Sequence, residues 1–158
     1  MNIRPVKRDD STKLLQIGLD TGIFEPGEAE ELLGQTLVDL FDGKLPDGHQ
    51  AHLVQQDASI KGWVYFGPMN KTNVWNLWWI GVDPNAKGKG FGKMLLKFVE
   101  DVVAKSNASK LLIETSSSSL LEHTRDFYTR QLYTVSHVDA NAYGQGEDKV
   151  VFYKHLTQ

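Results

Sequence analysis

The segment from Val74 to Lys105 combines a buried strand, a glycine-rich turn and an amphipathic helix. Within it, every second residue from Lys87 to Gly92 is glycine. Glycine has no Cβ, so the backbone there can turn tightly and approach a ligand closely. The first N–H groups of the following helix lack intrahelical partners and, with the helix dipole, can bind phosphate oxygens. The segment therefore predicts a phosphate-binding loop rather than a turn that is merely flexible.

The residues before the glycines predict a strand that is covered on both faces. Apolar side chains occupy both alternating sets between Val74 and Val82: Val74, Trp78, Ile80 and Val82 on one, and Trp75, Leu77 and Trp79 on the other. Such a strand is typical of the middle of an α/β sheet. Asp83-Pro84 is expected to end it, because proline cannot donate a hydrogen bond to a neighbouring strand.

The residues after the glycines predict an amphipathic helix that connects two parallel strands. Apolar residues recur at helical spacing, at Leu95, Phe98, Val99, Val102 and Val103. The residues expected to face outward are Lys93, Lys97, Glu100, Asp101 and Lys105. Asn107 is expected to stop the helix, and Leu111–Glu114 is the next predicted strand. A strand, a crossover helix and a second strand imply a parallel pair with the usual right-handed connection.

Two other glycine-rich motifs compete with this interpretation. A Walker A loop requires G-x-x-x-x-G-K-[ST], and that spacing does not occur in the chain. A dinucleotide fold requires G-x-G-x-x-G and an acidic residue about 20 residues further on, which is roughly where Glu114 lies. However, Gly92 comes one position too early, and Lys93 stands where the third glycine should be. The mid-chain loop also leaves too little sequence for the second half of that fold.

The loop and a second motif together resemble one family. Val82–Gly92 reads VDPNAKGKGFG and resembles V-x-P-x-x-[QR]-G-x-G-x-[GA], the signature of the GNAT superfamily of acyl-CoA-dependent N-acyltransferases. Downstream, Thr124–Tyr128 (TRDFY) resembles the helix of that family that ends in Phe-Tyr. The order of the elements around both motifs also agrees, so the resemblance covers essentially the whole chain.

The chain departs from the family pattern at three places. Lys87 stands where Gln or Arg is usual, which leaves the backbone of the loop unaffected. Leu121 stands near a frequent Asn, so one polar contact to the cofactor is in doubt. Leu132-Tyr133 replaces a common Gly-Phe or Gly-Tyr, which puts the shape of the preceding helix end in doubt.

The resemblance implies an α/β (α+β) fold in which residues 1–158 form a single domain. Its sheet is mixed and mostly antiparallel, with about six to seven strands, a splayed parallel central pair and about four flanking helices. It also implies acetyl-CoA, or coenzyme A, as co-substrate, with no metal. The residues expected to bind it are Ile80, Val82, Lys87, Gly88, Lys89, Gly90, Gly92 and Lys93.

Acyl transfer from a thioester needs a neutral amine, a stabilised oxyanion and a protonated leaving thiolate. If strand 74–82 parts from strand 111–114, as in the family, the amides of Ile80 and Val82 can bond the thioester carbonyl and the pantetheine. The match to Phe-Tyr makes Tyr128 the expected general acid. Glu114 is a candidate base, because it ends a central strand beside the cofactor site; water relays without a dedicated base are the alternative. His123 is expected to be exposed on the first turn of the tyrosine helix.

The acceptor is expected to be a small-molecule or peptide amine, and a homodimer is an open prediction. In GNAT folds the early helices and their junction overhang the acceptor pocket, which makes Phe24 and Glu25 candidate contacts. Tyr143 is a further candidate, in a loop (residues 140–148) predicted between the last two strands. The remaining predicted elements are a strand at 3–6, helices at about 9–19 and 27–41, a hairpin of strands 51–56 and 60–66, and strands 134–139 and 149–154.

Composition excludes several classes of function. A chain of 158 residues with 41% hydrophobic content can build one core. It has no cysteine, which removes disulfides and thiol chemistry, and its scattered histidines show no metal-ligand spacing. No apolar run approaches the ~20 residues of a membrane span, so a cytoplasmic location is expected. The net charge of −3 gives no reason to expect nucleic-acid binding.

Two functions from different classes fit the motifs. The first is an N-acetyltransferase that moves an acetyl group from acetyl-CoA to a primary amine by direct attack. The second is a non-catalytic module that binds acyl-CoA as a sensor or interaction partner. Tyr128 favours the enzyme, because a sensor has no need of a proton donor at the thioester.

Overall fold

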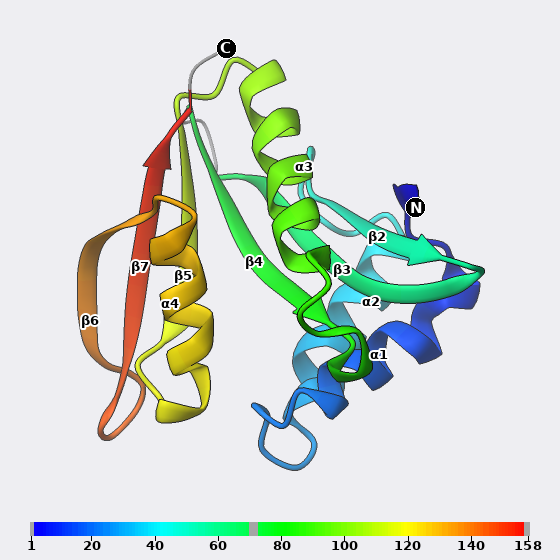
Figure 1. The fold of residues 1–158 in the computed structure, drawn as a ribbon, viewed down its shortest axis with the longest axis horizontal. Coiled ribbons are helices and arrows are strands. Elements are labelled where there is room, and N and C mark those ends of the chain that lie inside the picture. Colours follow the sequence, from blue (N-terminus) through cyan, green and yellow to red (C-terminus); the bar gives the residue numbers. More distant parts are fainter. Residues whose placement is uncertain (1, 70–72, 157–158) are drawn as a thin grey trace. The chain divides into compact units, whose positions relative to one another are not determined.

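The computed structural model describes residues 2–69 and 73–156 (Figure 1). Their strands form a seven-stranded sheet in the order β1-β2-β3-β4-β5-β7-β6. The strands are β1 (Asn2–Pro5), β2 (Gln50–Gln56), β3 (Ser59–Pro68), β4 (Val74–Val82), β5 (Lys110–Ser116), β6 (Thr134–Gly144) and β7 (Glu147–His155). The α-helices are α1 (Ser11–Asp20), α2 (Gln35–Phe41), α3 (Phe91–Lys105) and α4 (Glu122–Arg130). β4 and β5 are parallel, while β1–β2, β2–β3, β5–β7 and β6–β7 are antiparallel, which confirms the predicted fold class.

The chain divides into two compact units, and each is described by itself. The first unit comprises Met1–Gly67 and Trp79–Phe98, and the second comprises Pro68–Trp78 and Val99–Gln158. Strand β4 and helix α3 each contribute residues to both. In the part of the chain that the structure describes, no helix is long and apolar enough to cross a membrane.

The core of the first unit lies between β2–β3 and the two early helices. Its buried members include Leu14 and Ile17 of α1, Leu37 of α2, and Leu53 and Trp63 of the hairpin. The indole Nε1–H of Trp63 donates to the Leu14 carbonyl over 3.1 Å and so fixes α1 to the sheet. On the opposite face of β2, His52 lies against Phe98 of α3, with ring centroids 4.7 Å apart.

The second early helix differs from its prediction in one respect. The chain is π-helical from Glu30 to Gly34 before α2 begins, where a single regular helix was expected. This widened turn carries Leu33, whose Cδ1 would clash with a Cβ on Gly18 of α1. Any larger residue at position 18 would therefore force the Leu33 side chain to move.

The segment around the glycines folds as predicted. Strand β4 has the predicted bounds, and α3 ends at Lys105, two residues before Asn107, which takes a φ of 62°. An asparagine with positive φ just beyond a helix is a common stop signal. The parallel ladder pairs Val74–Leu77 with Lys110–Ile113.

The second unit corrects the prediction for one face of α3. Glu100 was expected to face water, but its carboxylate accepts a 2.7 Å hydrogen bond from the Tyr133 hydroxyl. It also pairs with Lys154 of β7 at 3.2 Å, and only 14% of its side chain is exposed. Burial and the neighbouring carboxylate raise the pKa of Tyr133. Glu100 thus fixes α3 to β7 and to the chain that follows α4.

The last two strands are longer than predicted, and the loop expected at 140–148 does not exist. β6 runs to Gly144 and β7 begins at Glu147, so only Gln145 and Gly146 connect them. The register shifts between Asp139 and Gly144, and Asn141 adopts a φ of 57°. This irregular pairing hides the usual alternation of a strand and explains why the segment resembles a loop in the sequence.

The departure from the family pattern at Leu132 has a structural consequence. Leu132 follows α4, is 76% exposed and has a φ of 71°, a conformation that favours glycine. We expect Leu132→Gly to raise the free energy of unfolding by about 1 kcal/mol, because it removes backbone strain and little buried surface. Urea denaturation measures the change. Gln131→Gly, at a residue with a φ of −86°, is the control and should give no gain. Equal effects of the two substitutions would contradict the assignment of strain to Leu132.

Candidate functional site

The glycine-rich loop lies in the first unit and has the backbone that its sequence predicts. Gly88 and Gly90 have φ angles of +77° and +85°. Among the described residues, nothing beyond the chain neighbours lies within 4 Å of a Cβ built on either. Glycine is therefore needed there for the backbone conformation and not for packing. Lys87, which precedes Gly88, and Lys89, which lies between the two glycines, are exposed, so the loop presents positive charge to solvent.

Helix α3 begins directly after the loop. Its first backbone bond runs from the Met94 N–H to the Gly90 carbonyl over 3.0 Å. The amides of Phe91, Gly92 and Lys93 precede that bond and so have no partner within the helix. Phe91 is buried at 2% exposure and holds the helix start against the core, while Lys93 is exposed. The result is a row of amides at the positive end of a 15-residue helix.

A buried carboxylate positions the chain that enters the loop. The Asp83 carboxylate accepts two hydrogen bonds, one from the Lys13 ammonium of α1 at 2.9 Å and one from the Asn85 amide at 3.0 Å. These two bonds hold the pKa of Asp83 below its ordinary value, and the bond from Lys13 has the larger effect. Sequence reasoning missed this pair, because the two residues are 70 positions apart and no local pattern connects them.

Strand β4, which precedes the loop, presents backbone amides along the edge that faces away from β3. The Asp83 N–H donates to the Lys61 carbonyl of β3 over 2.8 Å. Because N–H groups alternate in direction along a strand, those of Ile80 and Val82 point away from β3. The predicted amides thus lie on the edge of β4 opposite β3, in the same unit as the loop.

The predicted acid, Tyr128, lies in the second unit on α4 and is buried, with 3% exposure. Its ring packs against Phe152 of β7 and Tyr133, with centroids 5.5 and 6.3 Å away. Burial raises the pKa of Tyr128 well above its ordinary value. The phenol is therefore protonated throughout the neutral range, as an unperturbed tyrosine also is, and burial makes it a weaker acid. His123 is exposed on the first turn of α4, as predicted.

The second unit also brings Glu114 and Tyr143 close together. Glu114 is half-buried on β5 and pairs with Val151 of β7. Burial raises the pKa of Tyr143, and the nearby charges of Glu114, Glu147 and Asp139 raise it further. Tyr143 stands on β6 and not in a loop, and it is 46% exposed.

The predicted acceptor contacts differ in their surroundings. Phe24 lies between α1 and the next helix and packs on Trp79 of β4, with ring centroids 5.6 Å apart. Glu25 is exposed, and its amide donates to the Glu28 carboxylate over 3.4 Å. Trp79 did not enter the predicted site; its apolar neighbours in the sequence made it a core residue.

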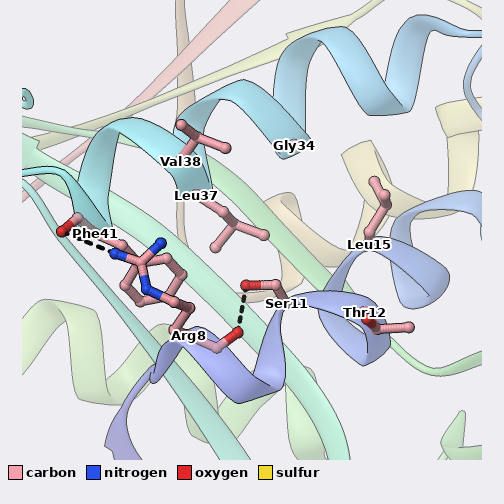
Figure 2. Close-up of a pocket in the computed structure, with 8 residues that line it drawn as sticks. All are labelled: Arg8, Ser11, Thr12, Leu15, Gly34, Leu37, Val38 and Phe41. Carbon is pink, nitrogen blue, oxygen red and sulfur yellow. Dashed lines mark hydrogen bonds between the residues drawn. The ribbon is translucent and has the colours of Figure 1, made fainter.

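A hollow of about 200 Å³ between α1 and α2 takes in none of the predicted site residues. Figure 2 shows the side chains that line it: Arg8, Ser11, Thr12, Leu15, Gly34, Leu37, Val38 and Phe41. Arg8 donates to the Phe41 carbonyl over 3.4 Å, and Ser11 donates to the Arg8 carbonyl over 2.7 Å. The first bond ties the segment before α1 to the end of α2, and the second ties the start of α1 to that same segment. Within residues 2–69 and 73–156, no group of three or more His, Cys, Asp or Glu side chains is placed to hold a metal ion.

Comparison with known families decides the assignment. A sequence model of the acetyltransferase (GNAT) family matches residues 21–132, which include the glycine-rich loop and Tyr128. The chain belongs to the GNAT family. A comparison with curated protein sequences gave no match.

Solved structures of GNAT proteins share the fold over nearly the whole chain. A protein from Desulfovibrio desulfuricans described as a GNAT-family acetyltransferase is 26% identical, with a TM-score of 0.90 and 98% of each chain covered. The ribosomal-protein-S18-alanine N-acetyltransferase of Escherichia coli is 16% identical, with a TM-score of 0.76 and coverage of 99% and 94%. The PaiA N-acetyltransferase of Thermoplasma acidophilum, solved with coenzyme A, is 16% identical, with a TM-score of 0.75 and 98% of each chain covered.

Proposed function

We propose that this GNAT protein transfers an acetyl group from acetyl-CoA to a primary amine. The observation that carries the proposal is the loop of Gly88 and Gly90, whose positive φ angles lead directly into the free amides at the start of α3. Such a row of N–H groups suits the diphosphate of coenzyme A. Lys87, Lys89 and Lys93 are exposed around it and add charge that complements the phosphates.

The amides of Ile80 and Val82 are proposed to bind the thioester carbonyl and the pantetheine. They point away from β3, which leaves that edge of β4 to accept an extended ligand. In this account the amine nitrogen attacks the thioester carbon, the carbon–sulfur bond breaks, and the acetyl group ends on nitrogen. An N–H donor at the carbonyl oxygen stabilises the negative charge that develops there.

Two proton transfers complete the proposed reaction. Tyr128 gives its proton to the departing thiolate, since a phenol is protonated at neutral pH. Glu114 takes a proton from the amine, directly or through water, and Tyr143 beside it lines the acceptor site. The alternative of water relays without a dedicated base predicts that Glu114→Gln leaves turnover unchanged.

We further propose that residues 1–158 act as one domain, since the family match at 21–132 draws on both units. The acceptor is a small-molecule or peptide amine. Two of the solved relatives are named for different amines, an alanine of ribosomal protein S18 and an aminoglycoside, so the shared fold does not select between these classes. Phe24 and Glu25 are the proposed acceptor contacts of the first unit. A homodimer stays a prediction.

Two measurements on one preparation test this function. Coenzyme A at 100 times its dissociation constant should stabilise the fold by about 2.7 kcal/mol, measured as a rise in Tm. Acetyl-CoA with a panel of amines should release free thiol, measured with a thiol reagent. Stabilisation by coenzyme A without release of thiol in the presence of any amine would favour the sensor function. The absence of both effects would rule out both the acetyltransferase and the sensor function.

A further inference from the structure

One buried hydrogen-bond donor of the first unit has no protein partner. Trp79 is only 8% exposed, and its indole Nε1–H finds no acceptor among the described residues. Its neighbour Trp63, whose ring centroid is 5.8 Å away, donates the same group to the Leu14 carbonyl. Two packed tryptophans thus differ in one respect: the N–H of Trp63 is satisfied, and that of Trp79 is not.

Buried N–H groups without partners are rare in native proteins, because each loses its bonds to water and gains nothing in return. Replacement by phenylalanine would preserve an aromatic ring at position 79 without that loss. The unsatisfied indole N–H of Trp79 is therefore a reason to look for a ligand atom that accepts its hydrogen bond.

The position of Trp79 places this donor beside the proposed reaction centre. Trp79 directly precedes Ile80, whose amide is proposed to bind the thioester. Consecutive Cα atoms are about 3.8 Å apart, so Trp79 belongs to the stretch of β4 at which the thioester is proposed to bind. Its ring also lies against Gly81, since a Cβ on that residue would clash with the Trp79 Cζ2.

One face of the Trp79 ring is covered by a residue from a connection between two helices. Phe24 lies on its ring, and it belongs to a connection, residues 21–27, that joins α1 to the next helix. Gly22 and Gly27 have φ angles of +73° and +83°, and among the described residues nothing beyond the chain neighbours lies within 4 Å of a Cβ built on either. Displacement of Phe24 would require rotation about these two glycines, and that rotation would act on the bonds that tie Gly22 to the Leu19 carbonyl and Gly27 to the Glu31 amide.

We propose that the indole N–H of Trp79 is a specificity-determining donor for the acceptor, which displaces Phe24 on binding. The inference rests on the proposed acetyltransferase function and narrows its substrate class. An attacking amine lies about 3 Å from the thioester carbon. An acceptor oxygen that bonds to the Trp79 indole is then expected to be only a few covalent bonds from the attacking amine nitrogen. The acceptor is a primary amine with a hydrogen-bond-accepting oxygen on the neighbouring carbon, either the carbonyl of an α-amino amide or the hydroxyl of a vicinal amino alcohol.

Matched amines with and without that oxygen test the proposal. L-alaninamide represents the carbonyl source and 2-amino-1-propanol the hydroxyl source, while 2-aminobutane replaces the hydroxyl by a methyl group. The ratio of kcat/KM for each oxygenated amine to that for 2-aminobutane is measured in the wild type and in Trp79→Phe. Comparing ratios between proteins cancels the different basicities of the amines.

We expect the wild type to prefer one oxygenated amine, and Trp79→Phe to reduce that preference at least tenfold through KM. Trp79→3-benzothienylalanine, which keeps the shape of the indole and lacks only the N–H, should give the same loss if the phenylalanine variant packs poorly. The KM for acetyl-CoA should stay within about twofold of the wild type in both variants.

Three results would overturn the proposal. One is equal preference in the wild type and the benzothienyl variant, which would make the indole N–H purely structural. Another is turnover of 2-aminobutane as fast as of both oxygenated amines. The third is no turnover of either oxygenated amine by a wild type that turns over other amines. Coenzyme A binding, measured by calorimetry in the same samples, separates these results from failure of the acetyltransferase function itself.

Discussion

Tyr128→Phe is expected to lower kcat by about 10²-fold or more, since it removes the proposed donor to the thiolate and keeps the ring. The ring supplies the packing of Tyr128 against Phe152 and Tyr133, so the fold should survive the loss of one oxygen. The KM for acetyl-CoA should change little, because the hydroxyl acts on the leaving group in the transition state. Initial-rate kinetics with acetyl-CoA and the best amine from the panel measure both constants.

The chain offers a matched control in the same cluster. Tyr133→Phe removes another buried hydroxyl, one that is bonded to Glu100 at 2.7 Å. It should lower the stability while leaving kcat within a few-fold of the wild type. Equal kcat values for Tyr128→Phe and the wild type would remove Tyr128 from the mechanism. A decline of the same size in both variants would trace the effect to packing.

The second large effect is expected at Gly90. Its φ of +85° is strained for any residue with a Cβ, and Gly90→Ala should cost about 1–2 kcal/mol if the loop keeps its shape for the ligand. That cost corresponds to about a tenfold loss of coenzyme A affinity, and more if the added methyl group meets the phosphates. Isothermal titration calorimetry measures the dissociation constant directly.

Gly34→Ala is the matched control for that substitution. Gly34 has a φ of −62°, and among the described residues nothing beyond its immediate neighbours lies within 4 Å of its added Cβ. Alanine there should leave the affinity for coenzyme A unchanged and slightly favour the helix. If Gly90→Ala bound coenzyme A as tightly as Gly34→Ala, the phosphates would not depend on this loop.

The sequence alone predicts the part of the molecule that local chemistry determines. The bounds of β4, the end of α3 near Asn107 and the glycine turn before α3 all follow from residue type and spacing. Each depends on a property that a residue carries with it: apolar periodicity, the absence of a Cβ, or tolerance of positive φ.

The sequence did not predict contacts between side chains that lie far apart along the chain. Nothing in the helical pattern of α3 shows that Glu100 meets Lys154, 54 residues later, or that Lys13 meets Asp83. The same is true of Phe24, which packs on the ring of Trp79. The irregular pairing of β6 hid the strand that carries Tyr143.

The central claim is that backbone amides around Gly88, Gly90 and Gly92 hold the diphosphate of coenzyme A. Amide chemical-shift mapping by NMR during titration with coenzyme A tests it most directly, with pantetheine, which lacks the diphosphate, as the matched ligand. Coenzyme A should shift the amides of residues 87–93 together with those of Ile80 and Val82, whereas pantetheine should shift only the latter pair. Saturation by coenzyme A with the amides of residues 87–93 unmoved would contradict the claim.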